Sequence, residues 1–88
     1  MTLELGGKSP QLVFADAPAL DRVAKMVAGA ITGNAGQVCV AGSRLIVQRG
    51  VAGQLVEGIA AAFKALRPGH TWCGDTTLSP IILSLIHI

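Results

Sequence analysis

Aromatic and charged side chains are scarce in this sequence, and their scarcity excludes several kinds of protein. There is no tyrosine, there are two phenylalanines and one tryptophan, and only 14% of the residues are charged. The seven lysines and arginines are scattered along the chain and form no basic run. Nucleic-acid-binding surfaces combine clustered basic residues with aromatic side chains that stack on bases. The sequence therefore argues against nucleic acid as a partner.

Long apolar runs and cysteine pairs are also missing. No hydrophobic stretch approaches the ~20 residues that cross a bilayer, and the first residues lack the basic-then-apolar pattern of a signal peptide. Cys39 and Cys73 lie far apart in a sequence without a secretory signal, so reduced thiols are expected rather than a disulfide framework. These absences predict a cytoplasmic protein without a membrane partner.

Small aliphatic residues dominate what remains. Hydrophobic residues make up 51% of the sequence, and most of them are Ala, Val, Leu and Ile. This composition is typical of a globular core rather than of a disordered chain. The 88 residues nevertheless fall short of a typical domain of ~100–150 residues, and a short chain buries a smaller share of its surface. The apolar surplus favours a piece of a larger α/β protein whose other segments cover its apolar faces.

Hydrophobic spacing predicts four elements in the order strand, helix, strand, helix. Short apolar runs at 12–14 and 45–47 predict two buried strands, and apolar residues three and four apart predict amphipathic helices at 16–32 and 51–66. Strands joined by a helix of this length favour a parallel pair with a right-handed crossover. The predicted fold class is therefore α/β, a βαβα unit with parallel strands.

The segment TLELGGKSP at residues 2–10 places a glycine pair before Lys8 and Ser9, as the end of a phosphate-binding loop does. Such a loop needs a further glycine where this sequence has Thr2, and it should open a helix, whereas the residues that follow predict a strand. The segment is therefore not a P-loop. Its side chain with catalytic potential is the carboxylate of Glu4.

Two short motifs carry the strongest functional signal. LELGGKSP surrounds Glu4, and GNAGQVCVAGSR surrounds Cys39 further along the chain. In this order and at this spacing, the pair closely resembles the active-site signatures of the aldehyde dehydrogenase superfamily. The resemblance runs from Thr2 to about Leu66. It implies that residues 1–82 are an internal part of the catalytic domain of an NAD(P)-dependent enzyme.

The resemblance also implies a role for each motif residue. Cys39 is then the nucleophile that holds the aldehyde as a thiohemiacetal and a thioester, and Glu4 is the general base that activates water to release a carboxylate. Leu5 and Gly6 would contact the cofactor, which is NAD or NADP. The substrate would be a small aldehyde, and the full-length protein a homo-oligomer. Because the cofactor's phosphate-binding loop is absent from these 88 residues, the chain alone is expected to be inactive.

Glycines around both motifs have physical reasons to be small. Without β-carbons, Gly6 and Gly7 let the backbone lie close to a flat nicotinamide ring while a partly buried Glu4 points at the sulfur. Gly36 and Gly42 flank the cysteine and let its loop adopt turns that expose the thiol. The backbone N–H of the cysteine could then help to hold an oxyanion.

The sequence departs from the family at the two positions before Asn34. Relatives often carry apolar or aromatic side chains there, whereas this chain has Thr32 and Gly33, which predicts a wider or more polar substrate tunnel. Asn34 is not the family's oxyanion-binding amide, which lies upstream of this segment. The identity of the aldehyde and the choice between NAD and NADP stay open.

Two alternative functions also stay open. A CoA-acylating relative would pass the acyl group to a thiol instead of water, although such relatives generally lack the glutamate found here as Glu4. A non-catalytic α/β interaction module would merely pack Cys39 among apolar residues. A metal site is not expected, because His70 and Cys73 form one ligand pair where zinc needs three or four ligands.

The end of the chain, LSLIHI at residues 83–88, matches a translated adapter of the kind used in sequencing libraries. We expect this tail to be non-native and the partial catalytic domain to comprise residues 1–82. An ordinary apolar strand is the alternative for this segment.

Overall fold

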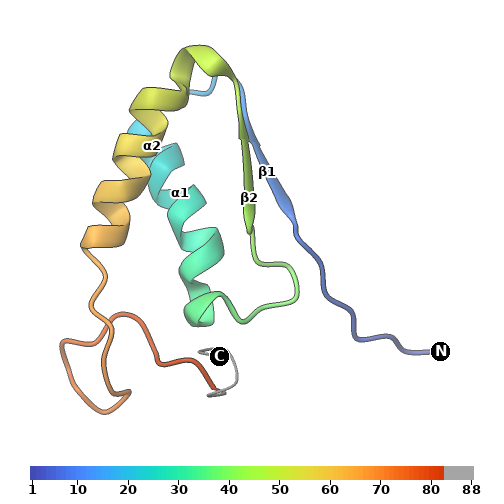
Figure 1. The fold of residues 1–88 in the computed structure, drawn as a ribbon, viewed down its shortest axis with the longest axis vertical. Helices are drawn as coiled ribbons and strands as arrows, with labels where there is room; N and C mark the ends of the chain where they lie inside the picture. The colour runs from blue at the N-terminus through green and yellow to red at the C-terminus, as the bar shows by residue number, and fades with distance from the viewer. Residues whose placement is uncertain (83–88) are drawn as a thin grey trace.

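The structure, a computed structural model, describes residues 1–82 and consists of two strands that alternate with two helices (Figure 1). In chain order the elements are β1 (Pro10–Val13), α1 (Leu20–Thr32), the short 3₁₀ helix η1 (Gly33–Gly36), β2 (Arg44–Val47) and α2 (Arg49–Lys64). The predicted βαβα order is therefore confirmed. The expectation that residues 83–88 are a non-native tail lies outside the described residues.

The two strands pair in parallel, as the sequence predicts. The register runs from Pro10 opposite Arg44 to Val13 opposite Val47. Pro10 occupies the first position of its strand, where a residue without an N–H is tolerated. Because parallel strands cannot be joined by a tight turn, the chain returns through α1 before β2 begins.

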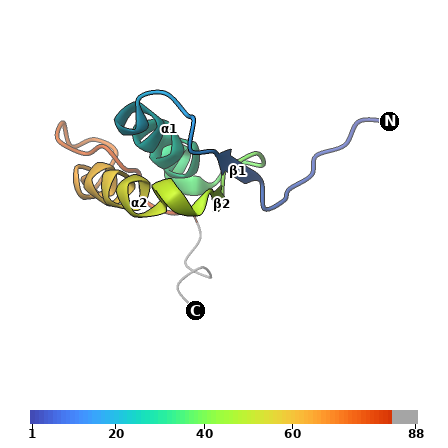
Figure 2. The same cartoon turned by 90° about the horizontal axis from the view of Figure 1, so that it is seen from above.

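Both helices pack on one side of this two-stranded sheet (Figure 2). The buried core consists of Val13, Ala24, Val27, Ala28, Leu55 and Ile59. Val27 of α1 lies in this core together with Val13 of β1, and Val23 packs against it, so the apolar face of the first helix covers the strands. The two helices also approach closely, because a β-carbon added at Gly58 would lie 2.8 Å from that of Ala24. Small residues at this crossing therefore determine how near the helices can lie.

The opposite face of the sheet is uncovered within the described residues. Leu12 is 58% exposed, Phe14 is 61% exposed and Ile46 is 54% exposed. The prediction of two buried strands is therefore wrong for the residues on this face, since side chains alternate between the faces of a strand and the helices cover only one face. An uncovered apolar sheet face agrees with the apolar surplus seen in the composition.

The helix boundaries differ from the predicted ones. α1 begins at Leu20 rather than at residue 16, because the chain first makes a turn in which the Ala17 N–H donates to the Phe14 carbonyl at 3.1 Å. Ala19, immediately before the helix, has a φ of 51°. α2 already begins at Arg49, with Gln48 alone between it and the second strand. Within residues 1–82, neither helix is long and apolar enough to cross a membrane.

Candidate active site

Cys39 lies in the cysteine loop, the name used here for residues 37–43, which connect η1 to β2. A turn holds the thiol at the surface, because the Ala41 N–H donates to the Val38 carbonyl at 3.0 Å. The sulfur of Cys39 is free and the residue is exposed. Within residues 1–82, the backbone N–H of Cys39 donates no hydrogen bond. Among the described residues, the loop therefore exposes both a free thiol and a backbone N–H without a hydrogen-bond partner.

The chain enters this loop through three residues in left-handed conformation. Asn34 has a φ of 50°, Ala35 of 56° and Gly36 of 77°. The Asn34 side-chain amide donates to the Gln37 carbonyl at 3.2 Å, and the Gln37 amide donates to the Asn34 carbonyl at 3.1 Å. This reciprocal pair stabilises a conformation that costs a non-glycine residue ~1–2 kcal/mol. The predicted need for glycine at position 36 is confirmed by its positive φ.

The chain leaves the loop at Gly42, which is fixed from two sides. Its N–H donates to the carbonyl of Ala30 in α1 at 3.0 Å, and its own carbonyl accepts from the Gln11 side chain at 2.8 Å. A β-carbon at this position would lie 2.5 Å from the Gln11 side chain. Glycine is therefore needed here for close approach, whereas the sequence suggested a turn.

The first motif reaches the second through Arg44. The Arg44 side chain donates through Nε to the Lys8 carbonyl at 2.7 Å, and its backbone N–H donates to the Ser9 carbonyl at 3.3 Å. Residues 1–9 form no helix or strand, and their N-terminal part extends away from the sheet in both views (Figures 1 and 2). The contacts through Arg44 therefore anchor the C-terminal end of the first motif.

A cavity of about 410 Å³ lies between the two motifs. Its lining consists of Gly6, Gly7, Lys8, Ile31, Gly36, Gln37, Val38, Cys39, Ala41 and Ser43. Two of the residues predicted from the sequence, Cys39 and Gly6, thus meet in one cavity. The strand pairing explains why they meet. Gly6 precedes β1, the cysteine loop precedes β2, and these two strands lie side by side in parallel.

Glu4 and Leu5 do not line this cavity. Both are exposed, and Leu5 is 71% exposed. The expectation of a partly buried Glu4 beside the sulfur is therefore not met in this 88-residue chain. Among the described residues, the hydrogen bonds that hold residues 1–9 involve Lys8 and Ser9, so they do not reach Glu4. A β-carbon at Gly6 or Gly7 would also meet no atom within 4 Å.

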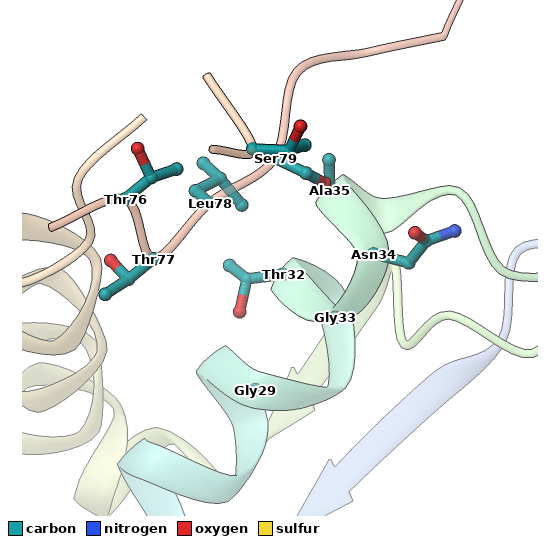
Figure 3. Close-up of a pocket in the computed structure, with 10 residues that line it drawn as sticks. Gly29, Thr32, Gly33, Asn34, Ala35, Thr76, Thr77, Leu78 and Ser79 are labelled. Atoms are coloured by element: carbon teal, nitrogen blue, oxygen red, sulfur yellow. The ribbon is translucent and has the colours of Figure 1, made fainter. Parts of the chain in front are cut away.

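A second hollow of about 460 Å³ lies between the end of α1 and the C-terminal segment 71–79 (Figure 3). Thr32 and Gly33 line this hollow and not the cavity of the cysteine, so the predicted effect of these positions on a substrate tunnel finds no support here. The hydroxyl of Thr32 donates to the Ala28 carbonyl at 2.9 Å. The amide of Asn34 points away from the threonines (Figure 3) and is held by the cysteine loop.

The two residues that the sequence left without a role stay outside the cavity. The ring of His70 stacks on Trp72, with 4.6 Å between ring centroids and 6° between planes. Cys73 is exposed. Within residues 1–82, no group of three or more His, Cys, Asp or Glu side chains is placed to hold a metal ion.

Sequence reasoning missed two glutamines that build the loop. Gln11 contacts Gly42, and Gln37 joins the loop to the C-terminal segment by accepting from the Ile82 N–H at 2.9 Å. A signal for Gln11 existed, because it is a polar residue beside an apolar run that predicted a buried strand. No pattern in the sequence indicated a partner for Gln37.

Fold and site together define a piece of an α/β protein that presents a thiol on a glycine-bounded loop. The model of the aldehyde dehydrogenase family matches residues 1–84. The chain belongs to this family, and the resemblance seen in its two motifs is thereby confirmed at the family level.

Three relatives illustrate the similarity. The chain is 42% identical over 81 residues to hydroxyisobutyraldehyde dehydrogenase of Mycolicibacterium austroafricanum, with 92% of this chain and 16% of the relative covered. It is 39% identical over 80 residues to the NADP/NAD-dependent aldehyde dehydrogenase PuuC of Escherichia coli, with 91% and 16% covered. The crystal structure of gamma-glutamyl-gamma-aminobutyraldehyde dehydrogenase from Burkholderia cenocepacia superimposes with a TM-score of 0.81 at 45% identity, with 85% and 15% covered. The chain thus spans about one sixth of the length of these relatives.

Proposed function

We propose that this chain is part of a longer, homo-oligomeric aldehyde dehydrogenase that oxidises a small aldehyde to a carboxylate through a covalent intermediate on Cys39. The observation that carries the proposal is the cavity of about 410 Å³ in which the exposed cysteine of one motif faces Gly6 and Gly7 of the other. Membership of the aldehyde dehydrogenase family supports the type of reaction. A residue that is only packed in a core would not lie at the surface of such a cavity.

The first step is the attack of the Cys39 thiolate on the carbonyl carbon of the aldehyde. A carbon–sulfur bond forms, and the carbonyl oxygen becomes an oxyanion. The uncommitted backbone N–H of Cys39 is a donor for that oxygen. The glycine-bounded turn serves this step by keeping the sulfur exposed while fixing the backbone on either side of it.

Cofactor binding is supported by the size of the cavity and by its glycine wall. About 410 Å³ falls within the ~300–1,000 Å³ of small-ligand pockets. Gly6, together with its neighbour Leu5, would hold the nicotinamide end. When bound, NAD or NADP supplies the hydride acceptor that turns the thiohemiacetal carbon into a thioester on Cys39. The Escherichia coli relative is an NADP/NAD-dependent aldehyde dehydrogenase, which supports either dinucleotide.

Glu4 would then remove a proton from the water that cleaves the thioester. In the described geometry Glu4 is exposed, so this role requires residues 1–5 to turn towards the cavity. Gly6 and Gly7 supply the backbone freedom for such a turn. Only Leu5 separates Glu4 from the cavity wall at Gly6, so the two Cα atoms are at most ~7 Å apart.

The presence of Glu4 favours water over CoA as the acyl acceptor. A CoA-acylating enzyme needs no general base to activate water, because a thiol replaces the water. The two outcomes differ in one product, a carboxylate or an acyl-CoA. Product analysis with and without CoA therefore separates them.

A chimaera of the Escherichia coli relative, in which residues 2–82 of this chain replace the matching segment, provides the test. The Cys39→Ala substitution should abolish NAD(P)H formation from an aldehyde. The matched Cys73→Ala substitution, at the other exposed cysteine, should leave the rate unchanged. A folded chimaera that is inactive, or one that keeps its activity after Cys39→Ala, would contradict the proposal.

A further inference from the structure

Gln11 bridges three elements that meet behind the cysteine loop. It lies in β1 and is partly buried. Its side-chain nitrogen donates to the Gly42 carbonyl at 2.8 Å and to the Val27 carbonyl of α1 at 3.2 Å. A carboxamide nitrogen carries two N–H donors, so both are used. One side chain thus connects the first strand, the first helix and the end of the cysteine loop.

The fit around this side chain is close. A β-carbon on Gly42 would lie 2.5 Å from the Gln11 side chain, so a larger residue would displace Gln11 from this contact. The Gly42 N–H meanwhile donates to the Ala30 carbonyl at 3.0 Å. Both polar groups of the Gly42 peptide backbone are therefore tied, directly or through Gln11, to the same helix.

Fixing Gly42 also restricts the orientation of the thiol. Cys39 lies inside the turn closed by the hydrogen bond between Ala41 and Val38, and Gly42 follows that turn directly. The other end of the loop is held by the reciprocal hydrogen bonds of Gln37. A turn fixed at both ends holds the Cα of Cys39 and the direction of its Cα–Cβ bond relative to the cavity, and this limits the positions that the sulfur can take.

We propose that Gln11 is a positioning residue for Cys39, which holds the sulfur in the orientation needed for attack on the aldehyde. This inference rests on the proposed function, because it assumes that Cys39 is the nucleophile. A nucleophile misplaced by about 1 Å can cost up to about 100-fold in rate. Loss of the two donors of Gln11 should therefore lower the rate constant for forming the covalent bond. It should reduce the fraction of folded, reactive protein much less.

The test is made in the chimaera with Gln11→Met, which keeps the length of the side chain and removes both donors. Gln54→Met is the matched control, because Gln54 is exposed on α2 and makes no side-chain hydrogen bond within residues 1–82. Both are made in a Glu4→Gln background, where the proposed function expects one turnover per molecule. Rapid mixing then gives the rate constant and the amplitude of the first NADH burst.

A positioning role predicts that Gln11→Met lowers the burst rate constant about 10- to 100-fold at unchanged amplitude. Gln54→Met should change neither quantity. A merely structural role would reduce the amplitude with the folded fraction and leave the rate constant intact, which would overturn the inference. An unchanged rate constant at full amplitude would overturn it as well.

Gln11→Glu keeps the test decisive if the methionine variant fails to fold. A carboxylate would face two carbonyl oxygens, whereas its protonated form regains one donor, so the burst rate relative to the parent should rise as the pH falls. A constant ratio across pH would contradict the inference. Failure of the proposed function is distinguishable, because in that case the folded parent chimaera would be inactive or its Cys39→Ala variant would still turn over.

Discussion

Arg44 Nε donates a 2.7 Å hydrogen bond to the carbonyl oxygen of Lys8, and this contact joins the two sequence motifs of the proposed active site. Lys8 lies in the first motif, four residues after Glu4. Arg44 lies at the start of β2, directly after the cysteine loop. The parallel pairing of the strands places these two ends side by side. The fold therefore brings together motifs that are distant in the sequence.

Loss of this contact should affect the step that depends on Glu4. We expect Arg44→Met in the chimaera to lower kcat about two- to tenfold, the equivalent of one hydrogen bond of ~0.5–1.5 kcal/mol. The rate of the first NADH burst should not change, because the cysteine loop keeps its own hydrogen bonds. Arg49→Met, at an exposed arginine at the start of α2, is the control. A slowed burst with an unchanged kcat would refute this assignment.

Gly42 and Gly53 should respond in opposite directions to the same substitution. Gly42→Ala places a β-carbon 2.5 Å from the Gln11 side chain, and we expect a loss of ~1–3 kcal/mol in the free energy of unfolding. Gly53→Ala lies inside α2, where a β-carbon meets nothing within 4 Å, and should gain ~0.5–1 kcal/mol. Urea unfolding of the chimaera measures both. A Gly42→Ala variant as stable as the parent would show that the contact at Gly42 is not tight.

The isolated 88-residue chain should neither bind NAD or NADP measurably nor oxidise aldehydes. Its cavity lacks Glu4, and its sequence lacks a glycine-rich loop for the cofactor phosphates. A site needs these groups placed together. Isothermal titration calorimetry should therefore give no saturable heat with the chain and a saturable signal with the chimaera. Saturable binding to the chain alone would mean that the site is more complete than we infer.

Local patterns predicted the order and pairing of the elements because each strand and helix carries its own apolar spacing. The burial of Leu12 and Ile46 could not be predicted in the same way. Their burial depends on what covers the second face of the sheet, and the residue type is the same whether that face is covered or exposed. The predicted start of α1 was also wrong, because the turn before it depends on backbone hydrogen bonds, which the residue types do not reveal.

The candidate site was predictable where residue identity decides the chemistry. The expected need for small residues at Gly36 and Gly42 followed from their missing β-carbons, and the structure places them at the two ends of the segment that carries the exposed thiol of Cys39. Gln11 escaped notice because its role depends on two distant carbonyl groups. The approach of Glu4 to the thiol stays a prediction, because it depends on a segment that leaves the sheet.

The division of labour between Cys39 and Glu4 is the central claim, and rapid mixing of the chimaera with aldehyde and NAD tests it most directly. Glu4→Gln should give at most one burst of NADH and then stall, with turnover reduced about 10²- to 10⁴-fold and a protein mass increased by one acyl group. Cys39→Ala should give no burst and no added mass, because no carbon–sulfur bond can form. Steady turnover by Glu4→Gln at the parent rate, or any burst from Cys39→Ala, would contradict the account.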